Sequence, residues 1–158
     1  MKKFFLLFSL LLPVCCLLSP ASSLQTPQPD SSAVVSREYQ LSMNVRGEEM
    51  TGLCLMEVQD LDRVVGTIIN EFGVKIFDFT YAQGKAKVLN VMEPIDKWYI
   101  RRVLRADMAF IITHMLKGEN ATCKRRQFSM TASGEMHMSN EKYRLYYTFI
   151  PMTHHETD

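Results

Sequence analysis

Alternating apolar and polar residues mark several strands in the first half of the chain. In 38–45 every second residue is apolar, which is the period of a strand with one buried face. Similar stretches follow at 50–58, 63–72, 74–81 and 85–92, and short polar or glycine-containing turns separate them. The pattern predicts five consecutive antiparallel strands.

The fourth of these stretches is apolar in both phases of the alternation. Phe77, Phe79 and Tyr81 share one phase, whereas Val74 and Ile76 fall in the other. Such a strand has no purely solvated face. We therefore expect a helix to cover one side of the sheet, while the far face or the curvature of the sheet covers the rest.

The apolar period lengthens to three or four residues in 96–117, which predicts a long amphipathic helix. Asp96 is a suitable N-cap and Gly118 a suitable C-terminal cap. A weak hairpin and a final strand over 142–150 follow. The expected fold is α+β, with this helix against the concave face of a curved antiparallel sheet of about eight strands.

The ends of the chain differ in composition from its middle. Residues 1–23 combine two lysines, an apolar run and small residues, which is typical of a bacterial secretory signal peptide. Residues 24–36 are rich in serine and proline and predict a flexible linker. We expect a single domain over 37–151 and a disordered tail over 152–158.

Cys15 and Cys16 leave a second interpretation of the N-terminus open. A lipoprotein signal places an acylated cysteine after a short apolar run and small residues, but Val14 is larger than usual there. We therefore favour a cleaved protein over a lipid-anchored one. An uncleaved anchor is less favoured, because a membrane span needs about 20 residues. Both favoured interpretations place the protein outside the cytoplasm, in the envelope of a bacterium.

Charge and cysteine content narrow the partners and the chemistry. Removal of residues 1–23 takes two lysines from the 18 basic residues and none of the 17 acidic ones, which changes the formal net charge from +1 to −1. This balance does not favour a nucleic-acid partner. Cys54 and Cys123 remain after cleavage, and they are either a disulfide pair or free thiols, Cys54 then being a small buried residue.

No familiar catalytic pattern is present in the sequence. It has no nucleophile elbow, phosphate-binding loop, dinucleotide glycine pattern or zinc-protease helix motif. Met136-His137-Met138 holds soft metal ligands, but alternation along a strand would send both methionines to one face and the histidine to the other. We therefore expect neither an enzyme, nor a cofactor, nor a metal site.

Basic residues recur at four-residue spacing along the predicted helix, at Lys97, Arg101 and Arg105. Such a stripe is most often a solvated helix face. It can also contact anionic lipid headgroups or an acidic partner despite a neutral net charge.

The stretch of about residues 50–116 resembles a group of envelope proteins and lipoproteins from Bacteroidetes. The resemblance rests on Gly52, on the block 70–73, on Phe77-Asp78-Phe79 and on the acidic residue Glu93 before the basic helix. These proteins resemble in turn the LolA/LolB lipoprotein-carrier superfamily, whose open half-barrel shelters acyl chains beneath a helical lid.

This resemblance implies an apolar cavity between sheet and helix, occupied by a lipid or by the acyl chain of a lipoprotein. The residues expected to line the cavity come from the aromatic strand and the helix, and they are Phe77, Phe79, Tyr81, Ile100, Met108 and Met115. The alternative is an interaction module or accessory subunit of an envelope complex, in which the same residues form a solid core.

Overall fold

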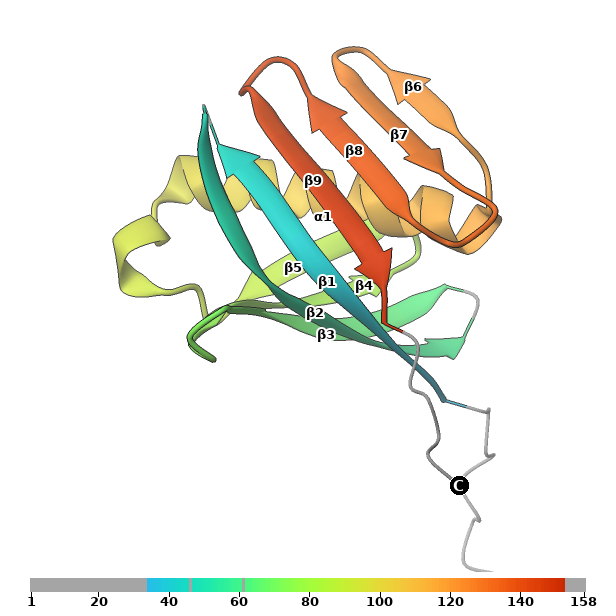
Figure 1. Ribbon diagram of the computed structural model, residues 1–158, viewed down its shortest axis with the longest axis horizontal. Coiled ribbons are helices and arrows are strands. Elements are labelled where there is room, and N and C mark those ends of the chain that lie inside the picture. The colour runs from blue at the N-terminus through green and yellow to red at the C-terminus, as the bar shows by residue number, and fades with distance from the viewer. Residues whose placement is uncertain (1–33, 46, 61, 153–158) are drawn as a thin grey trace, which may run out of the picture. The chain divides into compact units, whose positions relative to one another are not determined.

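Nine antiparallel strands form a single open sheet in the part of the chain that the structure describes (Figure 1). The structure is a computed structural model and describes residues 34–45, 47–60 and 62–152. The strands are β1 (Val35–Val45), β2 (Glu48–Asp60), β3 (Arg63–Asn70), β4 (Lys75–Ala82), β5 (Lys85–Leu89), β6 (Ala121–Cys123), β7 (Arg126–Met130), β8 (Met136–Asn140) and β9 (Leu145–Pro151).

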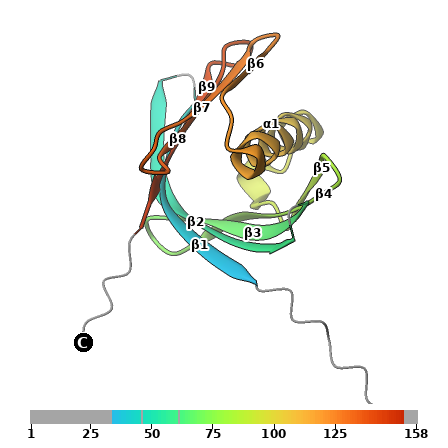
Figure 2. The same cartoon turned by 90° about the vertical axis from the view of Figure 1, so that its right-hand side faces the viewer.

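The sheet curves around one α-helix, α1 (Trp98–Lys117), which follows a short 3₁₀ turn, η1 (Glu93–Ile95) (Figure 2). The strand order is β5-β4-β3-β2-β1-β9-β8-β7-β6, so the first and last strands pair in the middle. In the chain, α1 connects the two edge strands, β5 and β6. The predicted α+β fold with a curved sheet and one long helix is therefore confirmed.

Strand alternation places one row of side chains from each strand on the concave face. In β1, Tyr39, Leu41 and Met43 are buried, and Leu41 and Met43 pair with Phe149 and Tyr147 of β9. Because residues of one row lie on the same face of adjacent strands, they join into a continuous apolar core.

A β-bulge explains why β4 is apolar in both phases. Ile68 pairs with Phe77, but Ile69 pairs with Lys75, so Ile76 is an extra residue on β4. Both Ile76 and Phe77 are buried. The change of phase in the sequence therefore marks a bulge that turns two consecutive side chains towards the core.

On the convex face, the apolar residues of β2 and β3 have no second layer over them within the described residues. Leu53 pairs with Ile69, and Leu55 pairs with Thr67, on the side opposite the buried Cys54. These outward side chains are half-buried, shielded only by their neighbours on the twisted sheet. Neighbouring side chains on the curved sheet, and no further layer among the described residues, therefore cover these outward apolar residues.

The helix begins at Trp98, two residues after the predicted start at Asp96. Lys97 is the N-cap, and no side chain caps the helix; the expected cap, Asp96, instead accepts hydrogen bonds from Arg101. The prediction of an Asp96 cap was therefore wrong, because an ion pair with a residue of the first helical turn competes for the same carboxylate. Gly118 ends the helix with φ of 65°, as predicted, and its N–H donates to the carbonyls of His114 and Met115.

Several predicted boundaries shift. The strand predicted over 63–72 stops at Asn70, because the Asn70 Oδ1 accepts the backbone N–H groups of Phe72 and Val74 at 3.0 and 2.8 Å and turns the chain. The three-residue strand β6 was not predicted and makes nine strands instead of about eight. β1 includes the last two residues of the predicted linker.

Residues 1–33 and 153–158, with the signal peptide, most of the linker and nearly all of the tail, lie outside the described residues.

Gly66 leaves room for an aromatic ring of the core. A Cβ atom at this position would lie 2.4 Å from Cζ of Phe79 and 2.6 Å from the backbone oxygen of Leu55. Phe79 is fully packed, so Gly66→Ala forces the ring and the backbone apart. We expect a loss of about 1–3 kcal/mol in the free energy of unfolding, measured by urea denaturation. Ser129→Thr, which adds one methyl group to an exposed strand position, is the control, and equal midpoints for the two variants would contradict the packing at Gly66.

Candidate functional site

The six residues predicted to line a cavity converge between β4 and α1, but they are packed against one another. All except Ile100 are buried, and Ile100 packs against the same cluster. The rings of Phe77 and Phe79 meet edge to face with centroids 6.4 Å apart, and the Tyr81 hydroxyl lies 2.9 Å from the Thr113 hydroxyl. In this structure these side chains form the core of the domain.

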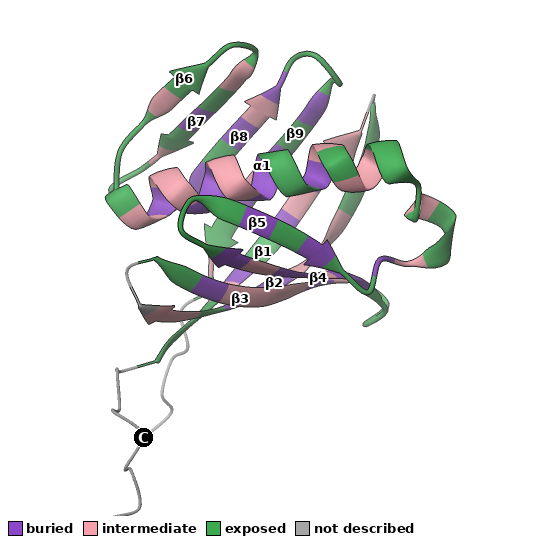
Figure 3. Cartoon of the chain, turned by 180° about the vertical axis from the view of Figure 1, so that it is seen from behind, coloured by how far each residue is buried: buried purple, intermediate pink, exposed green. Residues whose placement is uncertain are grey.

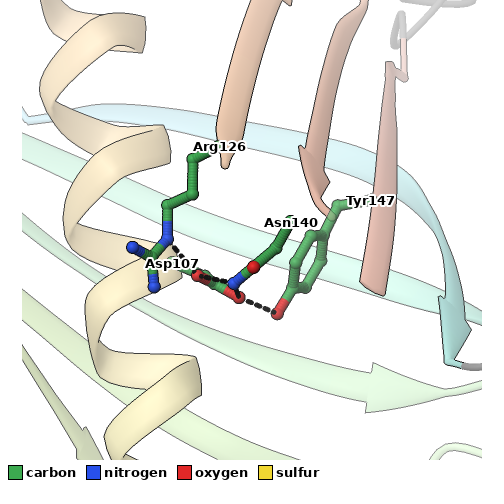
Figure 4. A network of polar contacts seen from close by, with 4 residues as sticks. All are labelled: Asp107, Arg126, Asn140 and Tyr147. Carbon is green, nitrogen blue, oxygen red and sulfur yellow. Dashed lines mark hydrogen bonds and ion pairs between the residues drawn. The ribbon is translucent and has the colours of Figure 1, made fainter. Parts of the chain in front are cut away.

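A buried carboxylate joins α1 to the second half of the sheet (Figure 4). Asp107 has no exposed surface, and its Oδ1 accepts hydrogen bonds from Nε of Arg126 at 2.6 Å and from Nδ2 of Asn140 at 2.8 Å. Its Oδ2 accepts a longer hydrogen bond, 3.4 Å, from the Tyr147 hydroxyl. We call these four residues the Asp107 clamp. The partners come from β7, β8 and β9, so one side chain of α1 holds three strands.

The electrostatics of the Asp107 clamp reflect two opposing effects. Burial raises the pKa of Asp107, while the Arg126 guanidinium and the hydrogen bonds from Asn140 and Tyr147 lower it, and the net direction is upwards. Burial and the neighbouring Asp107 charge raise the pKa of Tyr147, which keeps its hydroxyl a donor. Both carboxylate oxygens are committed to hydrogen bonds within the protein, which suits a structural role.

Only part of the predicted basic stripe forms a continuous surface. Lys97 is the exposed helix N-cap, and Arg101 is half-buried, with its guanidinium held by Asp96 and 3.4 Å from the Val88 carbonyl. The Arg101 hydrogen bonds hold the pKa of the Asp96 carboxyl below its ordinary value. Arg105 is exposed one turn further along.

Between α1 and β5 lies a hollow of about 480 Å³, which we call the basic groove. Figure 3 shows α1 running alongside β5 on this side of the domain. Arg101 and Arg105 line the groove and Lys97 does not. The complete lining is Lys87, Val88, Trp98, Arg101, Arg102 and Arg105.

A second hollow, of about 230 Å³, lies at the turn between β3 and β4, and we call it the Phe72 hollow. Phe72 stands at its rim with 80% of its surface exposed, and Ile76, Met92 and Ile95 also line it. None of the six predicted ligand-contacting residues lines either hollow.

The cysteines and the methionine–histidine segment occupy the positions that the strand pattern allows. Cys54 and Cys123 are both free: the first is buried in β2, where burial raises the pKa of its thiol, and the second is exposed in the edge strand β6. The disulfide left open by the sequence is therefore not formed. Met136 and Met138 face the core and His137 faces outward, as the alternation predicted. Cys15 and Cys16 lie outside the described residues.

Sequence reasoning missed Asp107, Trp98 and Lys87. A signal for Asp107 existed, since it occupies the apolar phase of the helix three residues after Leu104 and four before Ile111. Nothing in the local sequence places Lys87 near Trp98. The two residues come together only because β5 packs against α1.

Comparison of the sequence with protein-family models finds no match, and no curated protein matches it either. Within residues 34–152, apart from the two positions left undescribed, no group of three or more histidine, cysteine or acidic residues is arranged to hold a metal ion. The same residues contain no helix long and apolar enough to cross a membrane.

Loss of the Asp107 carboxylate should be costly. Asp107→Ala leaves the buried Asn140 and Tyr147 groups without their acceptor and separates Arg126 from its partner, so we expect a loss of about 3–5 kcal/mol in unfolding free energy by urea denaturation. Asp96→Ala also removes a carboxylate–arginine pair, but an exposed one, and should change stability little. Equal effects of the two substitutions would show that the Asp107 clamp does not hold α1.

The raised pKa of Asp107 also predicts a pH dependence. The folded protein takes up a proton at Asp107 at a higher pH than the unfolded chain, so this uptake adds stability as pH falls and removes it as pH rises. Between neutrality and the ordinary aspartate pKa of about 3.9, wild type should therefore gain stability relative to Asp107→Asn. Urea midpoints of both proteins across this range measure the difference, and a change in favour of the variant would contradict the assignment.

Proposed function

We propose that this protein is a non-catalytic binding module of the bacterial envelope, an accessory subunit that meets its partner through its outer surface. The observation that carries the proposal is the filled interior: Phe77, Phe79 and Met108 are at most 1% exposed between sheet and helix. The basic groove and the Phe72 hollow lie outside this core and remain accessible. A partner that needs no opening of the fold would bind at such surfaces.

The polar groups of the interior support a role without catalysis. Asp107 and Asn140 are the two buried polar or charged residues of the described chain, and they bond to each other. A general acid or base must reach a substrate, and a carboxylate whose oxygens are occupied by Arg126, Asn140 and Tyr147 does not. The proposal of a non-enzymatic protein also accords with the absence of catalytic patterns in the sequence.

A second candidate is the carrier of a lipid or lipoprotein acyl chain that the resemblance to the LolA/LolB superfamily implies. It is favoured by the open, curved sheet with an apolar concave face under one helix. Here α1 would leave β7–β9, and the acyl chain would replace it against Phe77 and Phe79, with about 0.8 kcal/mol gained per buried methylene. This movement must break the Asp107 clamp, so the carrier requires a second conformation.

Phe79→Ser separates the two candidates in one variant. If Phe79 is core, the substitution should cost about 3–5 kcal/mol in unfolding free energy, and it should not weaken the binding of a fluorescent fatty-acid probe relative to wild type. If Phe79 lines a cavity, stability should change less and probe affinity should fall. Denaturant midpoint and probe titration are the two measurements.

Phe72→Ser is the matched control, because Phe72 is the same residue type on an exposed turn. Its midpoint should stay close to that of wild type. Saturable probe binding by wild type, weakened by Phe79→Ser and unchanged by Phe72→Ser, would contradict the proposed module and favour the carrier.

A further inference from the structure

The basic groove concentrates positive charge on one side of the domain. Lys87 projects from β5, and Arg102 and Arg105 project from α1, around a hollow of about 480 Å³. All three are exposed, and no ion pair is found for them among the described residues. The fourth cation, Arg101, is engaged by Asp96. An ordinary solvated face mixes charges of both signs, whereas the groove lining contains no acidic residue.

An exposed aromatic pair borders these cations. Trp98 lines the groove with 75% of its surface exposed, and the neighbouring Tyr99 is 54% exposed. Their rings meet at 90° with centroids 6.0 Å apart. The fold buries less than half of the surface of either ring, so this exposed pair is suited to contact another surface.

The combination of amphipathic rings and unpaired cations matches the boundary of an anionic bilayer. Tryptophan and tyrosine favour the headgroup level, where their rings meet the acyl boundary while their polar atoms stay hydrated. Each lysine or arginine near such a surface raises the affinity for a membrane with anionic lipids about fivefold. The volume of the groove is within the range of about 300–1,000 Å³ found for small-ligand pockets, so it has room for a phosphate-bearing headgroup.

We propose that the basic groove docks this domain on a bilayer surface by binding the phosphate headgroups of anionic phospholipids, with Trp98 and Tyr99 inserted at the headgroup level. Lys87, Arg102 and Arg105 are the free cations that contact the phosphates. The inference rests on the proposed function only in that both place binding on the outside of the domain. The core remains closed while the surface is occupied.

Trp98 reports directly on this site, because it is the single tryptophan of the chain. The test uses protein purified from the envelope with its N-terminus as processed there, mixed with vesicles of phosphatidylcholine alone or with added phosphatidylglycerol. The anionic vesicles should shift Trp98 emission to the blue and co-sediment the protein, and added salt should weaken both effects. Arg102→Ala combined with Arg105→Ala should lower the affinity for anionic vesicles by about 30-fold.

Lys124→Ala combined with Arg125→Ala is the matched control. It removes the same charge from exposed positions between β6 and β7 and should leave the affinity unchanged. The N-terminal segment is common to all variants, so the ratio between them isolates the groove.

Equal losses in the two double variants, or no blue shift with anionic vesicles, would overturn the inference. It would also be overturned if polyglutamate or inorganic phosphate gave the blue shift in place of the vesicles, since the groove would then serve an acidic protein or a free anion. Failure of vesicle binding leaves the result of the fatty-acid probe, and hence the proposed function, untouched.

Discussion

Attachment of α1 to both halves of the curved sheet holds this fold together. An open sheet with an apolar concave face exposes its core unless something fills the curve. On one side α1 packs against β4 and β5 through apolar contacts and the Tyr81–Thr113 hydrogen bond. On the other side the Asp107 clamp joins it to β7, β8 and β9. The edge strands β5 and β6 do not pair with each other. The contacts of α1 with both sides of the sheet therefore set the distance between these two edges.

The clamp combines a cost with geometric specificity. A buried carboxylate loses its hydration, and the raised pKa of Asp107 is the sign of that cost. In return, the carboxylate has hydrogen-bond partners at fixed positions on three strands, and this favours one rotation and one register of the helix. Apolar contacts alone are less directional, so neighbouring registers would compete. In this closed form the interior is filled, and the surfaces proposed to bind a partner lie on the outside of the domain.

The sequence predicted what depends on periodicity and missed what depends on tertiary contacts. Local rules predicted three features of the fold from the sequence. They are the alternation of Tyr39, Leu41 and Met43, the helix period and the Gly118 cap. The Asp96 cap failed because Arg101 competes for the carboxylate. The apolar phase changes at Ile76 in the sequence. This change can be identified as a bulge only when the pairing of β4 with β3 is known.

In the candidate site, too, local periodicity was predicted from the sequence and side-chain packing was not. The six residues predicted to line a cavity are buried or half-buried on β4 and α1, and their phases follow from local periodicity. Whether the space between them is filled depends on side-chain packing across the sheet, which the sequence does not specify. The basic stripe was visible in part. Its membership changed once β5 contributed Lys87 and the start of the helix contributed Trp98, while Lys97 became a cap outside the groove.

Native mass spectrometry of the protein purified from its native source tests whether the space between α1 and β4 is filled. The protein is washed beforehand at about 1 M salt, where charges are screened beyond about 3 Å and surface headgroup contacts are released. A closed core predicts the mass of the polypeptide, with any covalent N-terminal modification, and no retained lipid. A stoichiometric lipid that survives the wash and is released only on unfolding would contradict a filled interior and show that the space between α1 and β4 is a ligand cavity.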